Sequence, residues 1–125
     1  MKASDLRIGN YYNIYAEGKE YTYKVGLEDF CSDNYKNFEP IPLTEEWLLK
    51  FRFHSQIGYI KFIGEDYQDS SFEVAQNDLD KWYCYFRNFV KGAADDFVLL
   101  RNDLKHVHQL QNLYHSLTNK ELEIC

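Results

Sequence analysis

The chain has few residues of the types that stiffen or cross-link a backbone. It contains two prolines and six scattered glycines among 125 residues, and its three cysteines form no CxxC pair. Scattered glycines exclude a glycine-rich phosphate-binding loop. An odd number of widely spaced cysteines argues against a disulfide framework. We therefore expect Cys31, Cys84 and Cys125 to be ordinary thiols of a reducing compartment, with Cys84 buried in its aromatic surroundings.

Long apolar stretches are also missing. No run approaches the ~18 apolar residues that suggest a membrane-spanning helix, and the opening residues, Met1–Asp5, lack the apolar core of a signal peptide. These two absences predict a cytoplasmic protein that does not associate with membranes.

Positive charge is scarce. Lys and Arg total 14 against 20 Asp and Glu, which gives a formal net charge of −6 and a pI of about 5.1. Binding to a nucleic-acid backbone draws most of its affinity from basic side chains that neutralise phosphates. A nucleic acid is therefore an unexpected partner.

Aromatic residues, in contrast, are abundant. They make up 18% of the chain, with 11 Tyr and 9 Phe, within a hydrophobic content of 45%. Aromatic side chains pack well on the pleated surface of a sheet, so this composition favours strands. The length suits one domain with one core, and we expect a single domain over residues 1–125.

The clearest local signal lies in the stretch from Pro40 to Phe51. Two prolines hold the approach extended, Thr44 occupies an N-cap position, and two glutamates follow in the first turn, where the helix dipole favours negative charge. Leu43 and Leu48 are spaced for a hydrophobic staple. The pattern predicts a short helix from Thr44 to about Phe53 that presents Trp47, Leu48 and Phe51 to a core.

Alternation and turn residues predict the remaining elements. A hairpin with Gly18 in its turn is expected first, and then further strands and a C-terminal helix that ends at Asn119. In that helix Leu110, Leu113 and Leu117 are expected to be buried, and Gln109, Gln111 and Asn112 exposed. The fold class is therefore α+β: an antiparallel sheet of about five or six strands, with a short central helix and a C-terminal helix packed on one face. The expected strands cover 6–16, 20–27, 57–63, 71–75, 81–90 and 97–101, and the last helix covers 107–117.

Three stretches resemble the shared blocks of a known family. They are DLRIGN (Asp5–Asn10), PIPLTEEWLLKF (Pro40–Phe51) and VHQLQNLY (Val107–Tyr114), the last followed by Leu117 and Thr118. The family consists of small uncharacterised proteins encoded by Bacteroidetes bacteria, their prophages and phages. Arg52 stands where that family usually has glycine, and His115 where an aromatic residue is usual. The resemblance implies a cytosolic, often phage-borne accessory protein and implies no catalytic residues.

Tyrosines supply the candidate binding residues. Tyr is favoured at protein interfaces, and Tyr11, Tyr15, Tyr83 and Tyr85 are the candidate contacts of a non-enzymatic protein-binding accessory module acting on a host protein. The hairpin tyrosines could instead stack on bases in a nucleic-acid accessory protein. Few cations accompany them, so cross-strand packing is the simpler interpretation of the hairpin.

A small hydrolase or metal-dependent enzyme is the other alternative, and it would use His106, His108 and Asp103. Residues two apart do not share a helix face, which weighs against a metal site unless this segment is extended. Cys84 lacks a local nucleophile motif. The carboxylate pairs Asp66 with Asp69 and Asp95 with Asp96 fit turns better than acid–base or cation sites. We expect no catalytic residue, no metal and no cofactor.

Overall fold

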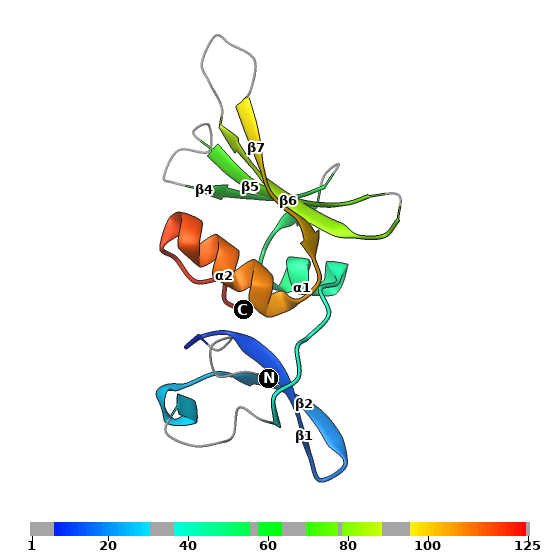
Figure 1. Cartoon of the computed structure of the whole chain (residues 1–125), viewed down its shortest axis with the longest axis vertical. Coiled ribbons are helices and arrows are strands. Elements are labelled where there is room, and N and C mark those ends of the chain that lie inside the picture. The colour runs from blue at the N-terminus through cyan, green and yellow to red at the C-terminus, as the bar shows by residue number, and fades with distance from the viewer. Residues whose placement is uncertain are drawn as a thin grey trace. The chain divides into compact units, whose positions relative to one another are not determined.

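The computed structural model describes residues 7–30, 37–55, 58–63, 70–77, 79–88 and 96–124. The chain forms two compact units (Figure 1). The first comprises Met1–Pro42 and His106–Glu121, and the second comprises Leu43–Lys105 and Leu122–Cys125. Each unit is described by itself below, and the expectation of a single domain stays a prediction.

The α+β class is confirmed, but the strands form two antiparallel sheets instead of one. The first unit holds β1 (Tyr11–Ala16), β2 (Lys19–Lys24), the 3₁₀ helix η2 (Leu27–Phe30) and α2 (Val107–Thr118). In the second unit, α1 (Glu45–Lys50) precedes a five-stranded sheet of order β3-β4-β5-β6-β7. Those strands are β3 (His54–Ser55), β4 (Tyr59–Ile63), β5 (Ser70–Gln76), β6 (Trp82–Asn88) and β7 (Asp96–Leu104).

The hairpin of the first unit forms around the predicted turn. Ala16 pairs with Lys19, and the two intervening residues both take positive φ, 52° at Glu17 and 77° at Gly18. Such a turn matches the twist of paired strands. A small core lies beneath the hairpin, where the Tyr12 ring stacks on Phe38 at a centroid distance of 5.8 Å beside Val25.

Strand β1 is shorter than predicted because it begins at Tyr11 and not at Leu6. Gly9 takes a φ of 95°, a conformation that L side chains rarely adopt, and the chain turns there before the strand starts. The segment is tied to the next strand by two backbone bonds: the Gly9 N–H donates to the Val25 carbonyl (3.0 Å), and the Val25 N–H donates to the Asn10 carbonyl (2.9 Å).

Helix α2 has the predicted end but a different buried face. Asn119 is left-handed, with φ 58°, and its N–H donates to the His115 carbonyl at 2.8 Å. The buried positions follow one helical face at i, i+3, i+4 and i+7: Val107, Leu110, Gln111 and Tyr114. The predicted exposure of Gln111 is therefore wrong, since this side chain has no exposed area, and Leu117 is 41% exposed instead of buried. Leu113, Gln109 and Asn112 are half-buried.

Helix α1 forms as its capping residues predict. Thr44 is extended, and its hydroxyl accepts from the Trp47 N–H at 3.5 Å. Trp47, Leu48 and Phe51 are all buried, as is Leu43 before the cap. The helix is short because Arg52 takes a left-handed φ of 66°.

The end of α1 is a Schellman motif. The Phe53 N–H donates to the Leu48 carbonyl and the Arg52 N–H donates to the Leu49 carbonyl, both at 3.0 Å. In this motif the residue at the position of Arg52 must be left-handed, and glycine is the usual choice because it has no Cβ. An arginine here keeps the motif at a steric cost.

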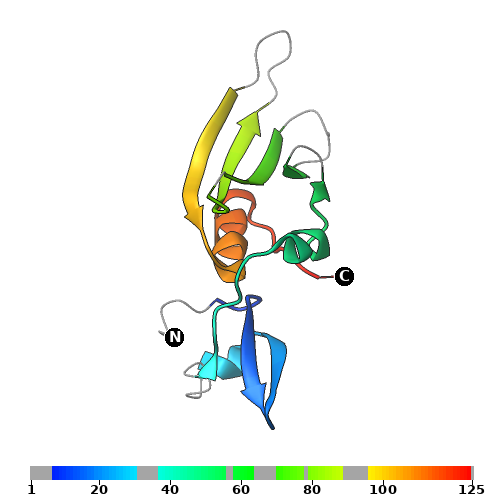
Figure 2. The same ribbon diagram turned by 90° about the vertical axis from the view of Figure 1, so that its right-hand side faces the viewer.

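Figure 2 shows the ribbon of the five-stranded sheet, and the side chains on one of its faces are buried. Phe72, Val74 and Cys84 have no exposed area on it, and Leu104 is 2% exposed. The Phe53 ring meets Phe72 edge-on at 6.2 Å. Because side chains alternate along a strand, Ser71 and Glu73 of β5 and Tyr83 and Tyr85 of β6 point to the opposite face. We call this second surface the outer face.

The two edges of this sheet differ greatly. At one edge β3 has two residues, whereas β7 at the other has nine. β7 pairs regularly with β6 from Asp96↔Asn88 to Leu99↔Tyr85, and then the register shifts twice before Leu104↔Trp82. Extra residues in β7 therefore bulge its C-terminal half, where a regular short strand was predicted to end at Arg101. In the described part of the chain, no helix is long and apolar enough to cross a membrane.

Candidate functional site

The outer face of the sheet carries a buried carboxylate held by three neighbours. Glu73 is only 6% exposed and lies opposite Tyr85 in the β5–β6 ladder, with Ser71 opposite Arg87. Its Oε1 accepts from the Tyr85 hydroxyl at 3.0 Å, and its Oε2 accepts from Ser71 Oγ at 2.9 Å and Arg87 Nε at 2.6 Å. A buried charge is costly unless it is paired and hydrogen-bonded, and this one is both.

The electrostatic state of this cluster follows from those bonds. The hydrogen bond to Glu73 raises the pKa of the Arg87 guanidinium, which stays charged. Burial raises the pKa of the Tyr85 phenol, which stays neutral near pH 7. The carboxylate and the guanidinium therefore offset each other, and the cluster fixes side chains without adding net charge.

Tyr83 stacks on Tyr85, the tyrosine that this cluster holds. The rings of Tyr83 and Tyr85 lie 6.1 Å apart at an interplanar angle of 22°, and the Arg87 guanidinium lies 5.8 Å from the Tyr85 centroid. Together with Leu99 of β7, these residues line a hollow of about 380 Å³. We call Tyr83, Tyr85, Arg87 and Leu99 the outer patch. All three β6 residues are half-exposed, and Leu99 is 57% exposed.

The four predicted tyrosine contacts are divided between the two units. Tyr83 and Tyr85 come together in the outer patch, whereas Tyr11 and Tyr15 belong to β1 in the first unit. Tyr11 is only 7% exposed, which contradicts its expected role as a surface contact. Tyr15 is 60% exposed, and its hydroxyl donates to Glu20 Oε2 at 3.4 Å.

Sequence reasoning missed the residues that hold and complete the outer patch. Glu73, Arg87 and Leu99 were not singled out, although Arg87 follows Tyr83 and Tyr85 at period two. That spacing alone places the three β6 side chains on one face. The pairing with Glu73 and Leu99 depends on strand register, which the sequence does not specify.

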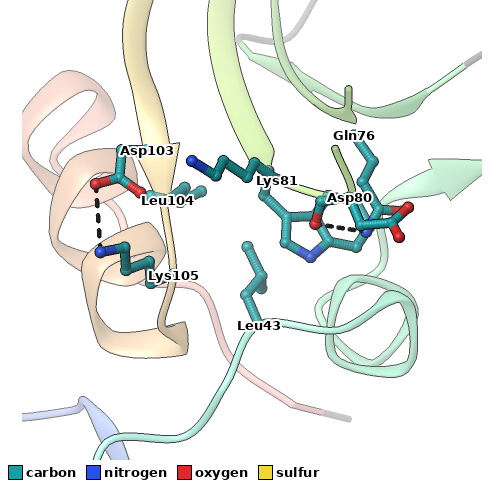
Figure 3. Close-up of a pocket in the computed structure, with 8 residues that line it drawn as sticks. Leu43, Gln76, Asp80, Lys81, Asp103, Leu104 and Lys105 are labelled. Carbon is teal, nitrogen blue, oxygen red and sulfur yellow. Dashed lines mark hydrogen bonds and ion pairs between the residues drawn. The ribbon is translucent and has the colours of Figure 1, made fainter. Parts of the chain in front are cut away.

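A second hollow of about 330 Å³ lies in the same unit (Figure 3). Two pairs of its residues already contact each other: Lys105 Nζ lies 3.6 Å from Asp103 Oδ2, and Gln76 Nε2 donates to the Asp80 carbonyl at 3.0 Å. The mixed charges give it no net preference for an ion. Eight residues line it, namely Leu43, Gln76, Asp80, Lys81, Trp82, Asp103, Leu104 and Lys105.

The histidine pair is closer than helical spacing predicts. His106 is the extended N-cap of α2 and His108 lies in its first turn, so their rings stack at 5.6 Å and 14°. The His108 ring also lies 5.1 Å from that of Tyr12. Asp103 belongs to the other unit. Within the described residues, no group of three or more His, Cys, Asp or Glu is placed to hold a metal ion.

The environment of Cys84 is unfavourable for nucleophilic chemistry. Its side chain has no exposed area, and burial raises the pKa of the thiol to about 11. At neutral pH it is therefore a thiol and not the reactive thiolate. The other cysteines and three of the acidic residues considered from the sequence, Cys31, Cys125, Asp66, Asp69 and Asp95, lie outside the described residues.

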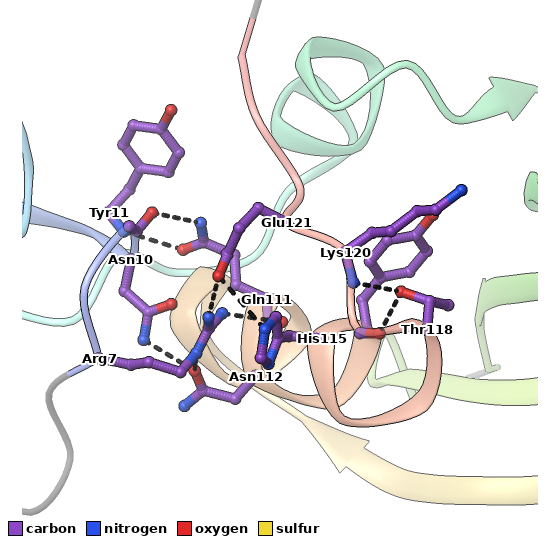
Figure 4. Close-up of polar contacts among 11 residues, drawn as sticks. Arg7, Asn10, Tyr11, Gln111, Asn112, His115, Thr118, Lys120 and Glu121 are labelled. Carbon is purple, nitrogen blue, oxygen red and sulfur yellow. Dashed lines mark hydrogen bonds and ion pairs between the residues drawn. The ribbon is translucent and has the colours of Figure 1, made fainter.

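The first unit contains a separate polar network around α2 (Figure 4). Gln111 accepts from the Tyr11 N–H at 2.9 Å and donates to the Gly9 carbonyl at 3.1 Å. Asn112 Oδ1 accepts from Arg7 Nε at 2.7 Å and from Asn10 Nδ2 at 2.8 Å, and Arg7 also pairs with Glu121. These bonds hold a turn of backbone against a helix, which is a structural role.

Comparison with known proteins adds no identity. The chain matches no protein-family model, no curated protein and no solved structure. The resemblance to small Bacteroidetes and phage proteins therefore stays a prediction.

Proposed function

We propose that this chain is a non-enzymatic protein-binding accessory module and that the outer patch is its binding surface. The observation that carries the proposal is the stacked pair Tyr83–Tyr85, which is half-exposed beside the exposed Leu99 and in which Glu73 holds Tyr85. Tyrosine and arginine are enriched at the energetic centres of protein interfaces.

Pre-organisation supports this proposal. Binding costs free energy for each flexible side chain that becomes fixed. Tyr85 is already bonded to Glu73, and its ring lies between Tyr83 and Arg87. Less conformational entropy is therefore lost when a partner covers the outer patch.

The charge of the outer patch favours a protein over a nucleic acid. Arg87 is the one cation of the patch, and Glu73 offsets it. A phosphate backbone requires several uncompensated cations. The family resemblance adds the expectation that the module is cytoplasmic and phage-borne and that its partner is a host protein.

The proposal is tested by affinity capture from a lysate of the native host, with identification by mass spectrometry. The wild-type chain is expected to retain a host protein that Tyr83→Ala loses, since this change removes the half-exposed ring and leaves the Glu73 bonds in place. Tyr15→Ala is the matched control, because Tyr15 is an exposed tyrosine of the other unit. If Tyr15→Ala loses the partner and Tyr83→Ala keeps it, the binding surface lies on the β1–β2 hairpin and the proposal is wrong.

Elemental analysis of untagged protein addresses the metal-enzyme alternative. We expect no transition metal at stoichiometry. One zinc per chain that His106→Ala abolishes would replace the proposed function with a metal-dependent one, built on the stacked pair His106 and His108.

A further inference from the structure

We propose that the partner binds as an extended segment that adds a strand to the free edge of β7. This inference rests on the proposed function and specifies its mode. In the described part of the chain, β7 is the last strand of its sheet and pairs on one side only, with β6. A strand edge presents a row of backbone donors and acceptors that another extended chain can satisfy.

The side chains of the free edge are accessible over most of its described length. From Val98 to Asp103 every side chain is exposed except that of Leu100, which is half-buried. Val98 is 59% and Leu99 is 57% exposed, and these neighbours point to opposite faces of the sheet. Among the described residues, none therefore covers either face of the edge at Val98 and Leu99.

The two edges of the sheet are protected differently, and this difference locates the docking segment. Proteins blunt edges with short strands, charges and bulges. β3 has only two residues, and the C-terminal half of β7 contains register shifts and the charged residues Arg101 and Asp103. The segment Phe97–Leu100 has no charge, and it includes the end of the regular ladder at Leu99.

The exposed groups define the chemistry of the added strand. In an added strand, the Cβ atom of the residue directly opposite Leu99 would lie about 4.5–5.5 Å from the Leu99 Cβ atom. An apolar side chain at that position would extend the wall of the hollow that Leu99 and Tyr85 line. A second apolar residue would cover Val98 on the other face. In the described residues no carboxylate pairs with Arg101, whereas Asp103 pairs with Lys105. A carboxylate at that end of the partner segment therefore completes the match.

Linear peptides selected from a random library on the immobilised full chain provide the probe. We expect selected peptides to carry neighbouring apolar residues near a carboxylate. Leu99→Lys and Val98→Lys are expected to weaken their binding about tenfold or more, since a lysine on an edge opposes strand addition. Leu49→Lys is the matched control, because Leu49 is an exposed leucine of α1 in the same unit.

Backbone methylation of the best peptide distinguishes strand addition from contact by side chains alone. Only alternate amides of an added strand face the edge, so N-methylation of one alternate set should abolish binding while the other set is tolerated. If both sets behave alike and Tyr83→Ala still prevents binding, strand addition is wrong and the binding surface stands. If neither Tyr83→Ala nor Leu99→Lys changes the affinity for the peptide, the proposed binding surface itself is wrong.

Sedimentation of the protein alone tests a competing occupant of the edge. A monomer at micromolar concentration is expected, because two copies would each bring a charge of −6. A dimer that Leu99→Lys dissociates would show that a second copy of this chain occupies β7, and it would overturn the partner assignment.

Discussion

Gln111 in the first unit and Glu73 in the second are both buried polar side chains, and they are held in different ways. Gln111 in the first unit is bonded to backbone groups of Gly9 and Tyr11. Glu73 in the second is bonded to the side chains of Ser71, Tyr85 and Arg87. Backbone groups remain after any substitution, whereas side-chain partners can be replaced together with the group that they serve. The backbone groups bonded to Gln111 therefore need a hydrogen-bond partner in every variant. The side chains bonded to Glu73 can be replaced by apolar ones that need none.

The largest effect is expected from Gln111→Ala. The change leaves the Tyr11 N–H and the Gly9 carbonyl without this partner, at a cost of about 1–3 kcal/mol for each buried group. The free energy of unfolding, measured by urea titration, should fall by the sum. Ser116→Ala, at an exposed position of the same helix, is the control and should change little.

Glu73→Gln should have the next largest effect. It keeps the shape of the side chain but removes the charge that faces Arg87, and hydrogen bonds to charged groups contribute about 1.5–3 kcal/mol. Urea titration at neutral pH is again the measurement. An unchanged midpoint would mean that Arg87 finds another partner as good as Glu73.

The sharpest test of the comparison is the double substitution Glu73→Leu with Arg87→Leu. Replacing both members of a buried ion pair by apolar residues is often neutral or stabilising, whereas removing one is costly. We expect the double variant to recover most of the stability lost by Glu73→Leu alone. If the double variant is as unstable as Glu73→Leu alone, the partners of Glu73 cannot be replaced together with it, and the proposed difference from Gln111 is wrong.

The smallest effect is expected from a change at Arg52, where the backbone takes a conformation that is unfavourable for a residue with a Cβ atom. Arg52 is left-handed at the Schellman position of α1. Arg52→Gly should stabilise the protein by about 1 kcal/mol, because glycine adopts this conformation without the Cβ clash. Arg52→Ala removes the same charge but keeps Cβ, so it should give no gain in thermal midpoint.

Local signals in the sequence were reliable where the structure depends on neighbouring residues. Thr44, Gly18 and Asn119 act within a few positions of themselves, and the cap, the turn and the helix end formed as predicted. The α+β class follows from those elements. The left-handed backbone of Arg52, in contrast, has no local signal of this kind, because glycine is the usual residue there.

Contacts between segments far apart in the sequence could not be predicted in the same way. Gln111 was assigned to water because an isolated polar residue on a helix is usually exposed, yet its partners lie about a hundred positions earlier in the chain. The division into two sheets, the burial of Tyr11 and the meeting of Glu73 with Tyr85 depend in the same way on which segments pair. Periodicity describes the faces of one element and not its partner.

The first unit joins two segments that are far apart in the sequence, and this separation affects folding during synthesis on the ribosome. Arg7 and Asn112, which share a hydrogen bond, are separated by 105 positions, and α2 is synthesised after β7. The hairpin β1–β2 must therefore wait, with Gly9 and Tyr11 unpaired by Gln111, while the whole β3–β7 sheet is synthesised. Vectorial synthesis thus delays completion of the hairpin's hydrogen bonds until α2 has been made.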